Sequence, residues 1–266
     1  YYIDSACPNN GTGTTDACAA SGGAAGAYND AAGIQTALTA AVADDIIYVK
    51  TGSGAYITTY ACSGGHCGGF HFANSGTSGH PITLKAYPGN TPILANGSYP
   101  MTSTPVDVPT IIGQTLSYIT IDGLKVSGQI VFWGDSGSFA HGLVIQNCEI
   151  VMGWTNAGAG NWAHIYLRYQ SGYLIRNNYM HDIAPPSDAG DQGPGCLITY
   201  DTDNSIDEYN TCKHVTTPNS TNHGLFGLFH KEVGISNITR YNWVEDIQDC
   251  LNGNTQVGQS TDEQWY

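Results

Sequence analysis

Hydrophobic and polar positions alternate in short runs along the second half of the chain, and these runs recur at a fixed spacing. Three stretches align without gaps, at 173–183, 205–215 and 237–247. Each has a short alternating run, an asparagine and a second short run, and the stretches are 32 residues apart. Strict alternation is the periodicity of a half-buried strand, and a long fixed repeat is typical of a solenoid. The pattern therefore predicts short strands joined by turns.

The repeat extends towards the N-terminus, because 145–150 and 121–126 both match 175–180. The alignment defines one apolar column, which consists of Val126, Ile150, Met180, Cys212 and Val244. A second set of strands is predicted, again 32 residues apart, at 164–168, 196–200 and 228–232.

No single repeat has enough apolar residues to form a core, so we expect the repeats to stack. Equivalent strands would then be parallel and about 4.8 Å apart. The same stacking would place Asn178, Asn210 and Asn242 above one another as a ladder of hydrogen-bonded amides.

One helix is predicted near the N-terminus. Apolar residues fall on one helical face between Ile34 and Val42, and Asn29 or Asp30 can serve as the N-cap. We expect this helix to cover the N-terminal end of the stack, because exposed strand edges promote aggregation. The predicted organisation is an N-terminal loop and capping helix at 1–43, stacked coils at 44–256 and a tail at 257–266.

The coil pattern of residues 44–256 resembles that of the right-handed parallel β-helix family. This family includes pectate, alginate and chondroitin lyases, polygalacturonases and phage tailspikes. The resemblance implies an all-β fold, a single-stranded right-handed parallel β-helix. Because one fold hosts many functions, the activity must be argued from individual residues.

Charge and cysteine content restrict the partners and the compartment. Eight Lys and Arg against 22 Asp and Glu give a net charge of −14, which opposes binding to nucleic acid. A polyanionic substrate would need a cation or a local basic patch. No apolar run is long enough to predict a membrane span. Low charge, eight cysteines and four glycosylation sequons favour an extracellular protein, the sequons lying at Asn10, Asn96, Asn219 and Asn237.

Two local disulfides are predicted, Cys7–Cys18 and Cys62–Cys67. The second pair lies close to His66, but the other half of a zinc site is missing from this segment, so a disulfide is favoured. Cys212 is expected to be a buried thiol or to pair with a cysteine on an adjacent coil.

The resemblance implies a site in a groove along one sheet, walled by the segments 129–142, 151–163, 184–195 and 216–227. Lyases of this family use Lys or Arg as the base, and many use Ca²⁺ to neutralise a uronate carboxylate. The candidates here are Lys231 and Arg168, with His230 nearby by register.

Oxygen ligands for Ca²⁺ are offered by Asp188, Asp191, Asp201 and Asp203. Surface charge for the basic residues and ordinary turn chemistry for the aspartates are the competing interpretations.

Aromatic residues add a second signal. Sugar rings stack on exposed aromatic faces, and the candidates for such contacts are Trp133, Trp154, Trp162, Tyr166 and Tyr200. The competing interpretation is that these rings pack loops onto the stack.

Two functions stay open from the sequence. The first is a secreted carbohydrate-active protein that binds polysaccharide, either as a lyase that cleaves it by β-elimination or as a glycan binder without catalysis. The alternative is a structural extracellular protein whose subunits stack head-to-tail into a filament or surface layer. This alternative draws on the predicted last coil near 250–254, whose strand edges have no predicted cover and would pair with another subunit.

Overall fold

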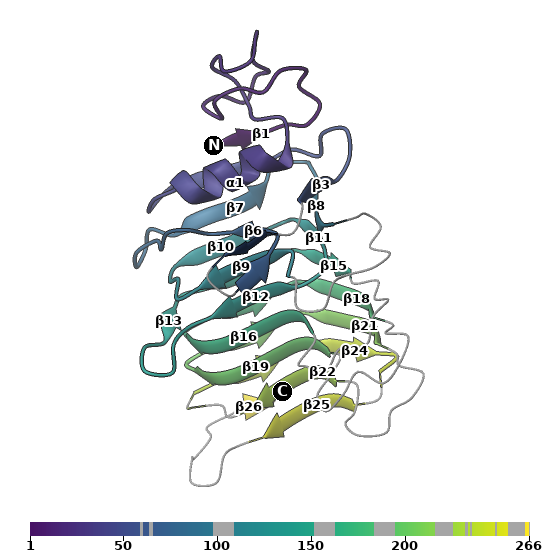
Figure 1. Ribbon diagram of the computed structural model, residues 1–266. Helices are drawn as coiled ribbons and strands as arrows, with labels where there is room; N and C mark the ends of the chain where they lie inside the picture. The colour runs from purple at the N-terminus through teal and green to yellow at the C-terminus, as the bar shows by residue number, and fades with distance from the viewer. Residues whose placement is uncertain are drawn as a thin grey trace.

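The computed structural model describes residues 1–58, 61–63, 66–97, 109–151, 163–183, 195–215, 226–231, 234, 236–247, 249–254 and 264–265. In this part of the chain, three parallel sheets form the body of the molecule (Figure 1). The first sheet contains, in order, β1 (Tyr2–Ile3), β2 (Ile46–Val49), β7 (Ile82–Ala86), β10 (Ile119–Asp122), β14 (Val144–Gln146), β17 (Leu174–Arg176), β20 (Ile206–Glu208), β23 (Ile238–Arg240) and β26 (Gln264–Trp265).

The second and third sheets follow the same order along the stack. The second contains β3 (Tyr56–Thr58), β8 (Ile93–Asn96), β11 (Lys125–Ser127), β15 (Glu149–Val151), β18 (Tyr179–Ile183), β21 (Thr211–Val215) and β24 (Trp243–Glu245). The third contains β6 (Phe70–His71), β9 (Ile111–Gln114), β12 (Ile130–Trp133), β16 (Ala163–Ser171), β19 (Gly195–Asp203), β22 (Phe226–Lys231) and β25 (Asp249–Asn254). Two short additions are β13 (Ala140–His141), which pairs with β16, and the antiparallel pair β4 (Ala61–Ser63) and β5 (His66–Gly68).

Successive strands visit the three sheets in turn, so that β17, β18 and β19 make one coil and β20 begins the next. Leu174 pairs with Ile206 and Ile206 with Ile238, which is the 32-residue repeat seen in the sequence. The chain is therefore a parallel β-helix, and the predicted fold class is confirmed.

The predicted apolar column is also confirmed. Register pairs join Val126 to Ile150, Ile150 to Met180, Met180 to Cys212 and Cys212 to Val244. The first four are buried, and Val244, on the last of these coils, is half-buried against the core. Successive side chains of a strand point to opposite faces, so these five positions all face the interior. A shift in register of one residue would turn every one of them to solvent.

The asparagine ladder forms at the bend between the first and second sheets. Asn178 Nδ2 donates to Asn210 Oδ1 and Asn210 Nδ2 donates to Asn242 Oδ1, each over 3.0 Å. Each side-chain amide also bonds to the main chain, as in the 3.0 Å bond from Asn210 Nδ2 to Ile175 O. The ladder thus satisfies polar groups that the bend leaves without sheet partners.

A disulfide across the interior joins Cys196 of β19 to Cys212 of β21. Of the two fates predicted for Cys212, pairing with a cysteine on an adjacent coil is the one observed. Cys148 is a buried free thiol, and burial raises its pKa to about 12.

Helix α1 (Ala31–Ala40) lies at the N-terminal end of the coils, as Figure 1 shows. Asp30 is the N-cap, and its Oδ1 accepts a 2.7 Å bond from Gly33 N. Ile34 and Leu38 are fully buried against the core. The predicted apolar face extends two residues past the end of the helix at Ala40: Ala41 is still buried, but Val42 is 59% exposed.

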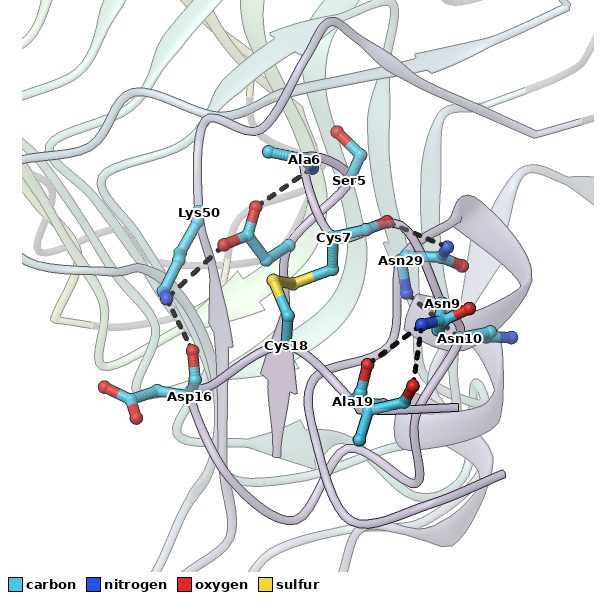
Figure 2. The surroundings of a disulfide bond; sticks show 12 residues. Ser5, Ala6, Cys7, Asn9, Asn10, Asp16, Cys18, Ala19, Asn29 and Lys50 are labelled. Atoms are coloured by element: carbon cyan, nitrogen blue, oxygen red, sulfur yellow. Dashed lines mark hydrogen bonds and ion pairs between the residues drawn. A yellow bond between two sulfur atoms is a disulfide. The ribbon is translucent and has the colours of Figure 1, made fainter. Parts of the chain in front are cut away.

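The predicted Cys7–Cys18 disulfide is present and closes the N-terminal loop on itself (Figure 2). Lys50 secures the same loop, since its Nζ lies 3.4 Å from Asp4 Oδ2 and donates to Asp16 O over 2.7 Å. Cys62 and Cys67 face each other across the β4–β5 pair, but their side chains lie outside the described residues. No helix in the described ranges is long and apolar enough to cross a membrane.

Candidate functional site

Several predicted site residues meet on the outer face of the third sheet. Trp133 pairs in register with Arg168, Arg168 with Tyr200, and Tyr200 with Lys231. We call these four positions the Arg168 row. Tyr166 lies two residues before Arg168 on β16 and therefore shares the same face. Residues far apart in sequence are thus brought to neighbouring strands, about 4.8 Å from one to the next.

The aromatic rings on this face contact one another edge to face. The ring centroids of Trp133 and Tyr166 are 6.3 Å apart, and those of Tyr166 and Tyr200 are 5.9 Å apart. Tyr200 is only 6% exposed and packs with Ala163 and Ile198 in a cluster separate from the core. Trp133 and Tyr166 are half-buried. Tyr200 is therefore covered by its neighbours on this face, whereas Trp133 and Tyr166 keep part of their surface exposed.

Arg168 is held over the same face by aromatic and charged neighbours. Its guanidinium lies 4.6 Å from the centre of the Tyr169 ring and donates to the Tyr169 hydroxyl over 2.8 Å. Arg168 Nε lies 3.6 Å from Asp201 Oδ2. Burial lowers the pKa of Arg168, but Tyr169, Tyr166 and Asp201 together raise it above its usual value. Arg168 thus stays cationic, which suits binding an acidic or hydroxyl group better than accepting a proton.

The prediction that His230 belongs to a catalytic surface is wrong. Its side chain points into the coils and is fully buried, with Nδ1 2.8 Å from Thr199 Oγ1 and Nε2 3.4 Å from Asp207 Oδ1. Burial lowers the pKa of His230 to about 4. A polysaccharide outside the coils cannot reach this ring. Lys231, the next residue, has its backbone position in the Arg168 row, and its side chain lies outside the described residues.

The predicted calcium ligands are not gathered into a site by the described residues. Asp201 is engaged with Arg168, and Asp203 is at the end of β19. Asp188, Asp191, Trp154 and Trp162 lie outside the described residues. Within the described ranges, one group of three possible ligands lies close together, Asp4 with Cys7 and Cys18, and its two cysteines form a disulfide. Calcium prefers six to eight oxygen ligands, so Asp4, Cys7 and Cys18 alone do not make a calcium site.

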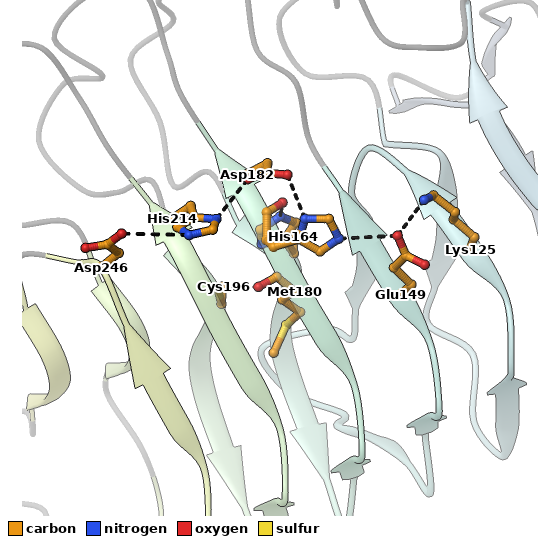
Figure 3. Close-up of polar contacts among 9 residues, drawn as sticks. Lys125, Glu149, His164, Met180, Asp182, Cys196, His214 and Asp246 are labelled. Atoms are coloured by element: carbon orange, nitrogen blue, oxygen red, sulfur yellow. Dashed lines mark hydrogen bonds and ion pairs between the residues drawn. The ribbon is translucent and has the colours of Figure 1, made fainter.

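A polar row on the second sheet was not anticipated from the sequence (Figure 3). It runs across successive coils through Lys125, Glu149, His181, Asp182, His214 and Asp246, and we call it the histidine–carboxylate row. His181 Nδ1 is 2.8 Å from Asp182 Oδ2, and His214 Nδ1 is 3.2 Å from Asp182 Oδ1. The signal was present, because Asp182, His214 and Asp246 are also 32 residues apart.

Neighbouring groups lower the pKa values of two carboxylates in this row, Asp182 and Glu149. Burial raises the pKa of Asp182, but the contacts with His181 and His214 lower it by more. The pKa of Asp182 therefore lies below its ordinary value. Glu149 behaves in the same way beside Lys125 and His181. The histidines are thus flanked by carboxylates on adjacent coils, and the row links neighbouring coils through the Lys125–Glu149 ion pair and the bonds of His214 and His181 to carboxylate oxygens.

The sequons have different environments. Asn237 is 2% exposed and its Nδ2 donates to Thr202 O over 2.8 Å, while Asn96 is 4% exposed. A glycan on either amide would need space that the folded chain does not leave, which corrects the prediction at these two positions. Asn10 is exposed, and Asn219 lies outside the described residues.

No family model matches this chain, and no curated protein matches it. Among solved structures, a rhamnogalacturonan lyase aligns with the whole chain at a TM-score of 0.59 and 16% identity, and the aligned part is 66% of that lyase. A GH136 lacto-N-biosidase from Eubacterium ramulus aligns with 94% of the chain at a TM-score of 0.48 and 10% identity, over 57% of its own length. The chain therefore spans less than two thirds of these two proteins. The first likeness shows a shared fold.

Proposed function

We propose that this protein binds a polysaccharide along the outer face of the third sheet. The observation that carries the proposal is the Arg168 row, with Trp133 and Tyr166 beside a fixed guanidinium. Partly exposed aromatic rings offer the apolar faces on which sugar rings stack, and Arg168 offers donors for hydroxyl or carboxylate oxygens. The rhamnogalacturonan lyase that shares the fold acts, by its name, on a glycan, and this supports testing glycans first.

Charge favours a sparsely charged glycan over a dense polyuronate. The chain carries a net charge of −14, and a polymer with a carboxylate on every sugar would be repelled over most of the surface. Arg168 can neutralise an isolated carboxylate at one position. A glycan with alternating neutral and acidic sugars, or a neutral one, suits this distribution of charge.

Cleavage by β-elimination is the finer part of the proposal. A base would remove the proton next to the uronate carboxylate, and the glycosidic carbon–oxygen bond would break. The leaving oxygen would keep the electron pair of that bond and take a proton from solvent, and the uronate ring at the other new end would carry a carbon–carbon double bond. Arg168 would pair with the carboxylate, and Lys231 is the residue of the same row with the chemistry of a base. The two disulfides accord with an extracellular location, which we propose together with this role.

Binding is tested by calorimetry with rhamnogalacturonan, polygalacturonate, alginate, galactan and xylan. We expect Trp133→Ala to weaken binding of the preferred glycan by about tenfold, because a stacked ring contributes about 1–2 kcal/mol. Trp243→Ala is the matched control, since Trp243 is 62% exposed but belongs to the second sheet. Equal losses for both variants, or no binding to any polymer, would contradict the proposal.

Cleavage is tested separately by near-ultraviolet absorbance of the products. A lyase yields unsaturated ends from uronate-containing polymers, and we expect Lys231→Ala to abolish them while binding persists. If the protein binds a polymer but no polymer yields such products, the lyase proposal is wrong and the glycan-binding proposal stands.

A further inference from the structure

A cavity of about 320 Å³ lies between the capping helix and the N-terminal strands of the third sheet. This volume is within the range of small-ligand pockets, roughly 300–1,000 Å³. Its lining comes from α1, β6, β9 and the residues that follow these strands, and includes Gln35, Thr39, His71, Ile112, Gln114 and Leu116. The lining is completed by Ala73 and by Phe72, which belongs to the hydrophobic core.

The cavity is continuous in register with the glycan-binding face proposed above. His71 pairs with Ile112 and Ile112 with Val131, while Gln114 pairs with Trp133. The floor of the cavity is thus the same outer face of the third sheet, one strand further towards the N-terminus than Trp133. A glycan chain that lies along the Arg168 row and is followed towards the N-terminal coils meets the cavity next.

Polar groups in the cavity are fixed by main-chain contacts. Gln35 Oε1 accepts from His71 N and Gln35 Nε2 donates to His71 O, both over 3.0 Å. The side-chain amide therefore covers the edge of β6 in place of another strand, which is how an edge is protected from other chains. It also fixes the position of His71 relative to the helix.

His71 supplies an unused hydrogen-bonding atom. Its Nε2 is buried and has no hydrogen-bond partner among the described residues. Burial lowers the pKa of His71, so the ring is neutral near pH 7. The remaining lining residues of the cavity carry no charge, and Ile112 and Leu116 are apolar. This combination matches a neutral sugar, which presents hydroxyls at its rim and C–H groups on its face.

The helix closes this end of the face. Helix α1 packs against β6, the edge strand of the third sheet, and Figure 1 shows it lying across the N-terminal end of the coils. A glycan seated on the third sheet cannot continue past α1 along the same line.

We propose that the cavity between α1 and β9 binds the terminal neutral sugar of a glycan whose following units lie on the Arg168 row. The inference rests on the proposed function and adds to it: the protein recognises a chain end rather than an internal stretch. Gln35 and His71 hold the polar rim, Gln114 joins the cavity to Trp133, and Leu116 contacts the sugar face.

The test uses linear galactan and xylan, each at full length and after partial acid hydrolysis, with calorimetry to count bound protein. For recognition of chain ends, bound protein at saturation follows the moles of chain ends and not the mass of glycan. We expect Thr39→Trp, which fills the cavity, and Gln114→Ala, which removes an amide, to weaken binding to the short chains by about tenfold. Thr36→Trp is the matched control, since Thr36 is an exposed residue of α1 outside the cavity.

The outcomes separate the two proposals. If bound protein follows glycan mass and both cavity variants bind as the wild type does, chain-end recognition is wrong, while the Trp133 face stands. If the wild type binds neither galactan nor xylan at either length, chain-end recognition of a neutral sugar is overturned, and the acidic polymers then decide the broader proposal. Circular dichroism of each variant shows whether a loss of binding reflects a loss of fold. Gln114→Ala changes an exposed residue and is therefore the variant least expected to disturb the fold.

Discussion

His164 is fully buried inside the coils, where its surroundings set its chemistry. Nε2 bonds to His181 O over 2.8 Å, and Nδ1 has no hydrogen-bond partner among the described residues. Burial lowers the pKa of His164 to about 3, so the ring is neutral in the folded chain. A proton on Nδ1 would be a buried charge without an acceptor, which is costly.

We therefore predict that the free energy of unfolding decreases as the pH falls below about 6.5, the pKa of an ordinary histidine. In that range the unfolded chain binds a proton that the folded chain does not, so acid favours unfolding. The loss from His164 is up to about 1.4 kcal/mol per pH unit until the folded pKa of about 3 is reached. Urea unfolding at several pH values measures it.

His164→Gln is the variant for this measurement, because its amide can still donate to His181 O. Its unfolding free energy should vary less between about pH 7 and pH 5 than that of the wild type. Glu149 and Asp182 act at lower pH, since their pKa values lie below the ordinary carboxyl range. An unchanged pH dependence in the variant would contradict this account.

At the scale of the structural element, the bend between the first and second sheets depends on the asparagine ladder. The residue before each ladder asparagine has a left-handed backbone, with φ of 54° at Asn177, 55° at Tyr209 and 57° at Tyr241. Such a backbone is unfavourable for tyrosine. The ladder compensates because each amide bonds both to the main chain and to the next coil.

We predict that Asn210→Ala lowers the free energy of unfolding by about 2–4 kcal/mol. The change leaves the buried Ile175 O and Asn178 N without this partner, and each unsatisfied group costs about 1–3 kcal/mol. Asn147→Gly is the control, because Asn147 is exposed and its φ of 56° suits glycine. Denaturant unfolding that gives equal losses for the two variants would show that the ladder adds little.

At the scale of the whole molecule, the stability of an open coil stack depends on its ends. Helix α1 covers the N-terminal end with Ile34, Ala37 and Leu38, all fully buried. Beneath it lie strand edges that would otherwise pair with other chains.

We predict that Leu38→Asp detaches the helix and makes the protein aggregate. An unpaired carboxylate at a fully buried site costs several kcal/mol, and release of α1 exposes the apolar end of the coils. Light scattering at increasing protein concentration measures the effect. Thr36→Asp, at an exposed position of the same helix, should remain as soluble as the wild type. Solubility of Leu38→Asp equal to this control would show that the end does not need α1.

The sequence by itself determined the coil period, the apolar column from Val126 to Val244, the asparagine ladder and the capping helix. These features can be recognised in the sequence because stacking imposes the same physical requirement at the equivalent position of every coil. Each inward position must be apolar and each bend must satisfy its own main-chain groups, so spacing alone reveals them.

The tertiary structure decided what outward and cross-coil positions do. It turned His230 inward, paired Cys196 with Cys212, assembled the histidine–carboxylate row and placed Gln35 on His71 to form the cavity. The 32-residue period aligns Asp182, His214 and Asp246 but does not show which side chains bond to each other. At outward positions solvent accepts many residue types, so the pattern carries little information about the contacts made there. Which of those residues meet depends on the twist and register of whole strands, and the chemistry of the surface follows from that geometry.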